Sequence, residues 1–412
     1  MKKAVITGMG VISPIGNDID TFWASIKAGK SGIGPITHFD ASGFDSRVAG
    51  EVKNFDPSQF MDKKDARKMA QFTQFAVAAA VQAWKESGLD TATTAMDRVA
   101  VVLGNGIGGI EVFEESYKKL LDSGPSRMLP LTVPLMITNE AAGNIAIHFG
   151  IKGPAITTAT ACASGSDAIG QALDMVRLGR ADIVIAGGTE AAISPFAVGG
   201  FCMLKALSTA HNDDPEKACR PFDAARDGFI IAEGAGIFVV ESEEHAKARG
   251  AKILAELAGY GASCDAYHIT APEPSGDGGA MAISRAIADA GIKPSDIAYY
   301  NAHGTSTQLN DPIETQMIKK AFGDHAYKMK VSSTKSMTGH MIAAAGAVEA
   351  IVCALAIRDG FFPPTINLDK PDDACDLDYV PNVGVKGTIN ATASGSLGFG
   401  GHNACIVLRK YS

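Results

Sequence analysis

The sequence lacks the features of several large classes of protein. Its 412 residues carry a net charge of −8, which excludes a broad nucleic-acid-binding face but allows a local basic patch. The seven cysteines are scattered and form no CxxC pair, which favours the reduced thiols of a cytoplasmic protein over a disulfide framework or a zinc site. The most apolar long segment, residues 341–357, contains Glu349 and is too short to span a bilayer comfortably. We therefore expect neither a nucleic-acid partner nor a membrane segment.

The chain is too long for one ordinary core, and it has no low-complexity linker. Its 45 glycines indicate many tight turns. The first residues, MKKAVITGMGVISPIG, begin like a signal peptide, but glycine and proline interrupt the apolar run early. We interpret this stretch as a buried strand and a loop.

Two pairs of passages repeat each other. Residues 78–109 and 282–307 each read as an amphipathic helix ending at glycine, a short linker, a strand and a small-residue loop. Residues 158–179 and 332–360 each read as a Ser/Thr-rich strand end, a tight turn and a helix. The shared order indicates a duplicated βα unit, and thus an α/β protein with mixed, mainly parallel sheets. We place the boundary between the halves near residue 250, giving domains 1–250 and 251–412.

Two short motifs suggest other functions. Gly104–Gly109 fits GxGxxG, but no acidic strand end follows, so we prefer a close-packing turn to a dinucleotide site. Ser332–Lys335 fits SxxK, but the SDN and KTG motifs that accompany it in penicillin-binding proteins are missing. Neither motif by itself predicts the function.

One cysteine lies among unusually small residues, in the stretch TTATACASGSDAIG. Cys162 falls at a predicted junction of strand and helix, where the amides of a helix start would favour the thiolate and lower the thiol pKa. Its small neighbours leave room for a substrate carbonyl and keep backbone amides free to bind an oxyanion. A buried structural role is the commoner fate of a cysteine, and we assign it to the other six.

Two histidines support a catalytic role for Cys162. His303 follows a predicted strand in NAHGTST, and His340 starts the helix of the second repeat, at the position analogous to Cys162. Lys335 and Glu349 flank His340 and could orient it or balance its charge. A cysteine with two histidines suits acyl-thioester chemistry, because the thiolate takes the acyl group while two imidazole N–H groups stabilise an enolate oxygen.

The motifs TATACASGSDAIG, NAHGTSTQLND, SSTKSMTGHMIAAAGAVEAI and GFGGHNA together resemble those of the β-ketoacyl-acyl-carrier-protein synthases. The likeness runs from VITGMGVISPIGN to the C-terminus, and it is strongest to the long-chain elongating enzymes of bacterial fatty-acid synthesis. The resemblance implies a thiolase-like fold of two duplicated halves in a five-layered αβαβα arrangement, usually as a homodimer. The N-terminal half would carry the nucleophile with the dimer and cap insertions, and the C-terminal half the two histidines. No cofactor is implied.

The family also implies a ping-pong decarboxylative Claisen condensation. Cys162 would accept an acyl chain from acyl carrier protein. His303 and His340, supported by Lys335 and Glu349, would then hold the malonyl thioester while carbon dioxide leaves. The amides of Cys162 and Phe399 would form the oxyanion hole, and Phe399 would also be a gate.

Further positions follow from the same resemblance. Ile107 and Phe399 would line the acyl pocket, where isoleucine is associated with longer chains. Other substrate contacts would come from Phe229, Thr305 and Thr307. The carrier protein would meet basic residues at matched loop positions, namely Lys63, Lys64, Arg67, Lys68, Arg127 and Lys205.

The sequence departs from the family before the gate, where Gly395 replaces an asparagine and Leu397 a phenylalanine. In some relatives that asparagine helps to bind a monovalent cation beside the residues equivalent to Asn301 and Glu349, so no metal is assigned with certainty. Three alternative functions stay open at this point. They are an active polyketide ketosynthase, a coenzyme A thiolase with a second cysteine at Cys405, and an inactive chain-length factor, which would be expected to lack Cys162.

Overall fold

The computed structural model describes all residues, 1–412, and contains ten strands that pair into one continuous sheet in the order β10-β9-β13-β14-β8-β1-β7-β6-β4-β5. These strands are β1 (Ala4–Ile12), β4 (Val99–Gly104), β5 (Ala155–Thr158), β6 (Ile183–Glu190), β7 (Gly234–Ser242), β8 (Ala255–Cys264), β9 (Tyr299–Asn301), β10 (Lys330–Ser332), β13 (Ala391–Gly398) and β14 (His402–Arg409). Two short ribbons pair β2 (Gly34–Pro35) with β3 (Val48–Ala49), and β11 (Phe361–Phe362) with β12 (Val385–Lys386).

Thirteen α-helices accompany the strands, several preceded by short 3₁₀ turns. They are α1 (Ile19–Lys27), α2 (Lys63–Ala66), α3 (Gln71–Ser87), α4 (Ile110–Ser123), α5 (Thr132–Met136), α6 (Glu140–Phe149), α7 (Ser164–Arg177), α8 (Pro195–Met203), α9 (Glu243–Ala248), α10 (Asp277–Asp289), α11 (Asn310–Phe322), α12 (Lys335–Thr338) and α13 (Ala345–Asp359). No helix among them is long and apolar enough to cross a bilayer.

The two halves of the chain repeat one topology. In the N-terminal half the strands stand in the order β1-β7-β6-β4-β5, and in the C-terminal half β8-β14-β13-β9-β10, so that both follow the order first, fifth, fourth, second, third. The halves join where β1 pairs antiparallel with β8, through Ala4 opposite Leu257 and Ile6 opposite Ala255. The duplication inferred from the sequence is therefore present in the fold.

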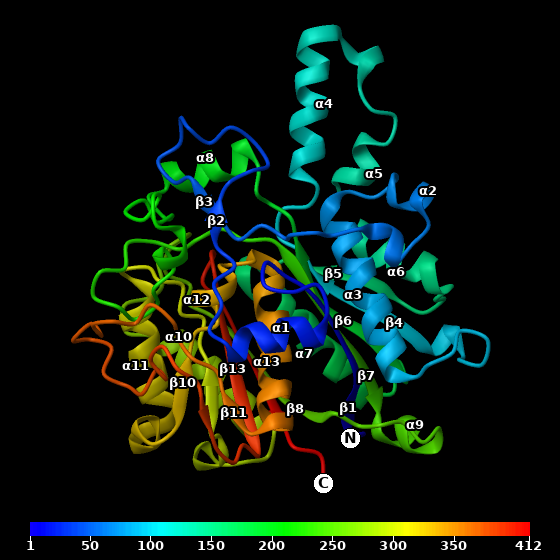
Figure 1. The fold of residues 1–412 in the computed structure, drawn as a ribbon. Coiled ribbons are helices and arrows are strands. Elements are labelled where there is room, and N and C mark those ends of the chain that lie inside the picture. The colour runs from blue at the N-terminus through cyan, green and yellow to red at the C-terminus, as the bar shows by residue number, and fades with distance from the viewer.

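Helices form layers on and between the two half-sheets (Figure 1). The helices α3 and α6 cover the outer face of the N-terminal half-sheet, α10 packs on β8 and β14, and α11 packs on α10. The helices α7 and α13 pack on each other and on strands of both half-sheets. This is the five-layered αβαβα arrangement of the thiolase-like fold.

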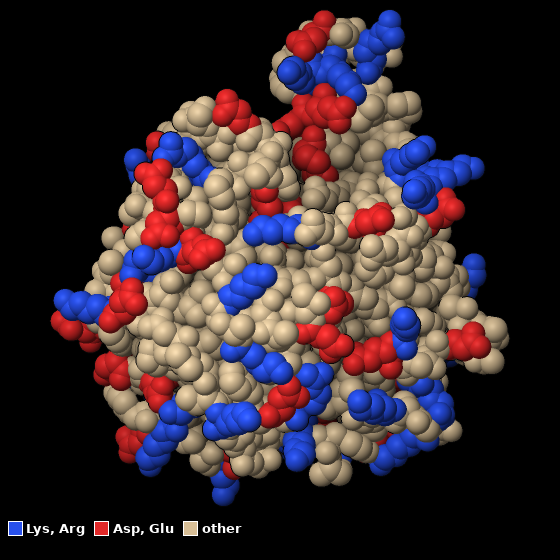
Figure 2. All heavy atoms as spheres, viewed as in Figure 1, with Lys and Arg blue, Asp and Glu red and all other residues tan.

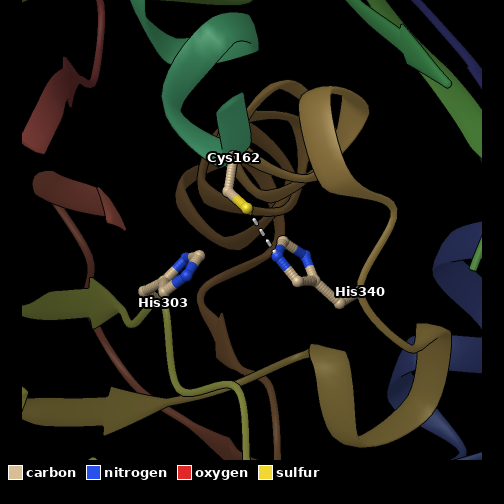
Figure 3. A group of neighbouring side chains, drawn as sticks. All are labelled: Cys162, His303 and His340. Carbon is tan, nitrogen blue, oxygen red and sulfur yellow. Dashed lines mark hydrogen bonds between the residues drawn. The ribbon is translucent and has the colours of Figure 1, made fainter. Parts of the chain in front are cut away.

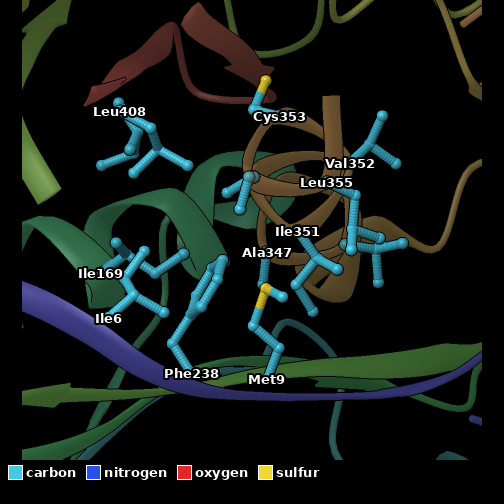
Figure 4. Close-up of a cluster of buried hydrophobic side chains, with 14 of the residues drawn as sticks. Ile6, Met9, Ile169, Phe238, Ala347, Ile351, Val352, Cys353, Leu355 and Leu408 are labelled. Atoms are coloured by element: carbon cyan, nitrogen blue, oxygen red, sulfur yellow. The ribbon is translucent and has the colours of Figure 1, made fainter. Parts of the chain in front are cut away.

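The central helix α13 explains the apolar segment 341–357. All its residues from Ala345 to Ile357 are buried, which requires apolar side chains around the whole helix. Figure 4 shows Ala347 and Ile351 of this helix facing Met9 and Phe238 of the N-terminal half-sheet, with Ile169 of α7 beside them. The largest core cluster thus holds the two halves together.

The sheet is less parallel than the sequence suggested. The strand β4 is parallel to β5 and β6, and β9 is parallel to β10 and β13, but every other pairing is antiparallel. The prediction of mainly parallel sheets is wrong because the last strand of each half, β7 or β14, runs antiparallel to both of its neighbours. The chain passes from β6 to β7 through residues 191–233, and from β13 to β14 through residues 399–401. Both connections start at the carboxyl end of a strand, at the edge of the sheet where the functional residues gather.

Gly395 in β13 leaves space for a tyrosine of the neighbouring strand. A Cβ atom at residue 395 would lie 1.9 Å from the hydroxyl oxygen and 2.8 Å from Cζ of Tyr300, whose ring is buried. Any larger side chain at 395 would have to displace this ring. Glycine at position 395, where the family has an asparagine, therefore makes room for the ring of Tyr300 on the adjacent strand.

We predict that Gly395→Ala destabilises the fold by about 1–3 kcal/mol, the usual cost of overpacking a core. In a Tyr300→Val background the same substitution should cost much less, because the ring that it meets is gone. Urea unfolding of the two single variants and the double variant measures this coupling. Gly143→Ala in α6, where the added Cβ meets nothing within 4 Å, is the matched control. Equal costs of Gly395→Ala in both backgrounds would contradict the steric account.

Candidate active site

Cys162 stands in a tight turn between β5 and α7. The turn is a 3₁₀ segment, Ala161–Ala163, in which Ala161 has a φ of 50°. The hydroxyl of Thr158 donates to the carbonyl of Ser164, and that of Ser164 donates to the carbonyl of Ala161. A Cβ on Gly165 would lie 2.6 Å from the carbonyl oxygen of Ala343. Small residues and short hydroxyls are therefore required here to hold the turn and to let α7 approach the second half.

The second half contains the same turn, but His340 is not its counterpart of Cys162. The 3₁₀ segment Ile342–Ala344 precedes α13 as Ala161–Ala163 precedes α7, and Ile342 has a φ of 45°. Its middle residue is Ala343. His340 lies before this turn, so the predicted equivalence of His340 and Cys162 is wrong. The histidine instead comes from the loop that follows α12, which has no counterpart in the first repeat.

Cys162 and the two histidines converge from three segments of the chain (Figure 3). The Nε2 atom of His340 lies 3.0 Å from Sγ of Cys162. The rings of His303 and His340 stand 5.2 Å apart and nearly perpendicular. One nitrogen of each ring and the sulfur all lie within 4.8 Å of one another. The histidine side chains are buried, whereas Cys162 is reached through a cavity.

All three groups are neutral at rest. Burial raises the pKa of the Cys162 thiol to about 12, although Lys335 and the amides of Phe399 and Cys162 oppose this rise. Burial and the nearby Lys335 ammonium hold the pKa values of His303 and His340 well below the usual range. The expectation of a lowered thiol pKa is therefore wrong in direction, because desolvation of the sulfur outweighs the amides around it. The raised pKa favours a protonated thiol, which lies within hydrogen-bond distance of Nε2 of His340.

Lys335 and Glu349 form a buried ion pair behind the histidines. The side chains are 1% and 3% exposed, and the Nζ atom of Lys335 contacts Oε1 of Glu349. Burial raises the pKa of Glu349 to about 7, against the effect of Lys335. The pair comes from α12 and α13, so it also ties the His340 loop to the central helix.

Three buried side-chain oxygens on α13, β9 and β13 have no hydrogen-bond partner, namely Oε2 of Glu349, Oδ1 of Asn301 and Oγ of Ser394. Asn301 and Ser394 are paired in register on adjacent strands. Such oxygen atoms are ligands that suit a hard cation, so the residues present fit the monovalent cation expected for the family. Gly395 contributes no side chain to this set.

Phe399 lies in the turn between β13 and β14, over the cysteine. A Cβ on the preceding Gly398 would lie 2.6 Å from the carbonyl oxygen of Thr160 and 3.3 Å from the amide nitrogen of Cys162, so glycine is needed for this approach. The amides of Cys162 and Phe399 both act on the sulfur. The positive φ angles of Gly400 and Gly401 let the chain turn back into β14.

A cavity of about 520 Å³ opens above the three groups. All five residues predicted to meet substrate line it, namely Ile107, Phe229, Thr305, Thr307 and Phe399. Lys205, which was predicted to contact the carrier protein, lines it as well. The other basic residues predicted to contact a carrier protein, Lys63, Lys64, Arg67, Lys68 and Arg127, are exposed and lie outside the cavity lining. Figure 2 shows basic side chains gathered on the surface over α2.

The structure gives packing roles to the GxGxxG motif and the SxxK motif. Gly104 packs against the start of α7, where a Cβ would lie 2.3 Å from the carbonyl carbon of Ser164, as a close-packing turn requires. Ser332 bonds to the hydroxyl of Tyr299, and Lys335 is paired with Glu349, so no serine–lysine couple exists. Cys405 is buried in β14 and does not line the cavity, unlike the second cysteine expected of a thiolase.

Two buried glutamates that we did not predict hold the site's loops. Glu190 accepts hydrogen bonds from the amides of Gly106 and Ile107, at 3.0 and 3.3 Å. Glu314 accepts from the amides of His303 and Gly304, both at 2.7 Å. Burial raises their pKa values, to about 8 and about 7. The only sequence signal for Glu190 was a charge at the end of a buried strand, in GGTE.

Comparisons with known proteins agree with this geometry. The "Beta-ketoacyl synthase, N-terminal domain" family matches residues 1–246, and the "Beta-ketoacyl synthase, C-terminal domain" family matches residues 254–369. The chain is 51% identical over 409 residues to the 3-oxoacyl-[acyl-carrier-protein] synthase 2 of Coxiella burnetii, covering 99% of each chain. It is 52% identical over 410 residues to the synthase of the same name from Staphylococcus aureus (strain COL), covering 100% of this chain and 99% of the relative.

Solved structures resemble it closely as well. A type II polyketide ketosynthase, bound to a hexaketide and in complex with its acyl-carrier protein, has a TM-score of 0.93 and 36% identity, with full coverage of both chains. The ishigamide ketosynthase/chain length factor has a TM-score of 0.94 and 38% identity, again with full coverage of both chains.

Proposed function

The chain belongs to the β-ketoacyl synthase family, and from this premise we propose that it is a 3-oxoacyl-acyl-carrier-protein synthase of fatty-acid elongation. The observation that carries the mechanism is the contact between the Cys162 thiol and His340, with His303 beside them, at the floor of the cavity. The polyketide ketosynthase and the ishigamide ketosynthase/chain length factor share the fold, but they are only 36% and 38% identical to this chain, against 51–52% for the 3-oxoacyl-[acyl-carrier-protein] synthases.

In the first half-reaction Cys162 takes the acyl chain. Its sulfur attacks the thioester carbonyl of the acyl carrier while the thiol proton moves to Nε2 of His340. The carbonyl oxygen becomes an oxyanion that the amides of Cys162 and Phe399 stabilise. The bond to the carrier sulfur then breaks, and that sulfur leaves as a thiol with the proton from His340. Proton transfer to His340 is needed because a thiol with a raised pKa supplies little thiolate by itself.

In the second half-reaction the two imidazoles act as neutral donors. Nδ1 of His340 has no hydrogen-bond partner to fix its tautomer, so Nε2 can carry a proton once the sulfur is acylated. N–H groups of both histidines hold the malonyl thioester oxygen as carbon dioxide leaves and an enolate forms. The enolate carbon attacks the acyl-cysteine, the carbon–sulfur bond breaks, and the released thiolate takes up one proton from solvent. The product is 3-oxoacyl-acyl-carrier protein.

Lys335 supports this step by keeping the histidines neutral, and Glu349 balances its charge. Asn301 and Glu349 would hold a monovalent cation, which would supply fixed positive charge at the site. The acyl chain would lie along Ile107, whose backbone is held by Glu190. Phe399 would cover Cys162 until an acyl chain is in place, which gives the ping-pong order a structural cause.

The protein partner would be an acidic acyl carrier protein. The polyketide ketosynthase of similar fold was solved with its acyl-carrier protein, which supports this partner. Exposed basic residues on and after α2, with Lys205 at the cavity, offer complementary charge. The seven cysteines are free, as suits a cytoplasmic enzyme.

A homodimer would complete the N-terminal sheet. The strand β5 is the last in the sheet order, so one of its edges is unpaired, and its Ile156 is 42% exposed. Ile147 of the adjacent helix α6 is 78% exposed. An exposed sheet edge with apolar neighbours is normally covered, and a second copy of the chain would cover it.

We predict that the two histidines separate the half-reactions. His303→Ala should slow malonyl decarboxylation by about 10²–10³-fold, the usual cost of losing one such donor, and leave acylation of Cys162 measurable. His340→Ala should impair both, because it also removes the acceptor of the thiol proton. Carbon dioxide release and the intact protein mass report the two steps, with His148→Ala as the control. Normal decarboxylation by His303→Ala would show that its role is misassigned.

The acyl pocket gives a second prediction. Each methylene buried stabilises the acyl-enzyme by about 0.8 kcal/mol until the pocket ends, so Ile107→Phe should restrict acylation to short chains within a series of about six to sixteen carbons. Glu190→Gln should also shift the chain-length profile of acylation, because the side-chain NH₂ of glutamine would face the backbone N–H groups of Gly106 and Ile107. Glu233→Gln is the matched control, because Glu233 is another buried glutamate whose pKa is raised to about 8, but it accepts from the amide of Val52 and not from those of Gly106 and Ile107. An unaltered chain-length profile of acylation in the Ile107→Phe variant would show that Ile107 does not line the acyl pocket.

A third prediction concerns docking of the carrier protein. The double variant Arg67→Glu, Lys68→Glu should raise the Michaelis constant for carrier-bound substrate, and more so at low salt, because rim charges act on association and are screened by ions. The control is the double variant Lys386→Glu, Lys410→Glu, with the same change of charge at exposed residues of β12 and the C-terminus. An equal effect in both variants would assign the loss to net charge and not to docking.

A fourth prediction concerns the proposed homodimer. Analytical ultracentrifugation of the chain should give twice its mass, and Ile156→Lys should shift it toward the monomer, because a charge on the edge of β5 opposes strand pairing. Leu178→Lys, at the 59% exposed end of α7, should leave the mass unchanged. A monomer in the unmodified protein would refute the proposal.

A further inference from the structure

The cluster that performs the proposed chemistry also has the composition of a metal centre. A cysteine sulfur and two imidazole nitrogens lie within 4.8 Å of one another, with a cavity open above them. Sulfur and imidazole nitrogen are the ligands that zinc prefers, and three protein ligands with one open position are the pattern of a reactive zinc site. The sequence contains no CxxC signature, so only the fold brings this set together.

The geometry accepts a metal ion if the two histidines adjust their positions relative to Cys162. With zinc bonds of about 2.3 Å to sulfur and 2.0 Å to nitrogen, tetrahedral ligands stand about 3.3–3.5 Å apart. Nε2 of His340 and Sγ of Cys162 are 3.0 Å apart because a proton lies between them. Replacing that proton by a larger ion requires this separation to grow by about half an ångström. The His303 nitrogen, which lies within 4.8 Å of the other two ligand atoms, must move inward by up to about 1.5 Å. Figure 3 shows both rings directed toward the sulfur.

The surroundings of the three ligands suit weak binding better than permanent binding. Each imidazole has a ring nitrogen near the sulfur that can give a lone pair to a metal ion. The charge of Lys335 is balanced by Glu349 in the adjacent ion pair, which limits the repulsion of a cation. Nδ1 of His340 has no partner, whereas the histidines of resident zinc sites almost always have one. The cluster thus has the ligands of a zinc site without its outer support, as expected of a site that binds reversibly.

We propose that a thiophilic divalent cation, with zinc as the representative, binds reversibly to Cys162, His303 and His340 and closes the enzyme to acylation. Binding forms a metal–sulfur bond and two metal–nitrogen bonds, and it releases the thiol proton to solvent. The fourth position faces the cavity and takes water. Because the sulfur and both imidazoles are then occupied, neither half-reaction can begin. Hard cations such as magnesium, which prefer oxygen, should not bind there.

Cobalt, a spectroscopic substitute for zinc, tests binding without any assay of activity. Titration of the full-length, reduced and chelator-washed protein with Co²⁺ should give sulfur-to-cobalt charge-transfer absorption, the intense visible bands of tetrahedral cobalt, and release of roughly one proton per site. Zn²⁺ should displace the cobalt, and Mg²⁺ should not. Cys162→Ala should lose the charge-transfer absorption, and His303→Ala should lose the tetrahedral bands. Cys264→Ala, at the one exposed cysteine, should keep both.

Charge-transfer absorption that survives in Cys162→Ala, or that disappears in Cys264→Ala, would overturn the proposed site. Inhibition is tested separately, and only this arm rests on the proposed function. Acylation of Cys162 should fall with the same midpoint as zinc binding and return after addition of a chelator. Cobalt bands with undiminished acylation would overturn the inhibition and leave the metal site standing. Absence of acylation in metal-free protein would count against the proposed function alone.

Discussion

The contact between the Cys162 thiol and Nε2 of His340 is the interaction on which the rest of the structure depends. It joins two halves of the chain that repeat one topology, and it exists only because α7 and α13 pack closely between the half-sheets. That approach requires Gly165, whose missing side chain leaves room for the carbonyl of Ala343. The duplicated fold therefore brings a cysteine thiol from one half against an imidazole from the other, as the proposed mechanism requires.

Burial determines how this contact works. Desolvation keeps the thiol protonated and both imidazoles neutral, and the Lys335–Glu349 pair places balanced charge behind them. Neutral imidazoles can accept the thiol proton in one step and donate N–H bonds in the next. The same convergence of one sulfur and two imidazoles underlies both the proposed reactivity toward thioesters and the proposed binding of zinc.

Much of this could be predicted from the sequence, because ordered motifs placed Cys162, His303, His340, Lys335 and Glu349 together before any fold was known. The failures have physical causes. The direction of the Cys162 pKa shift depends on burial, which sequence does not report. The residue that corresponds to Cys162 in the second half is Ala343, because His340 lies on a loop that the first half does not contain. Glu190 and Glu314 accept hydrogen bonds from backbone amides that a sequence motif does not link to them. The reason for glycine at position 395 is its contact with Tyr300, which only the fold shows.

The central claim is that Cys162 carries the acyl chain. Incubation of the protein with acyl-carrier protein bearing a medium or long acyl chain, followed by peptide mass spectrometry, tests it most directly. We predict one acyl group on the peptide that contains Cys162, and none in a Cys162→Ser variant. An adduct on Cys405 or another cysteine, or a Cys162→Ser variant that still condenses acyl and malonyl carriers, would contradict the account.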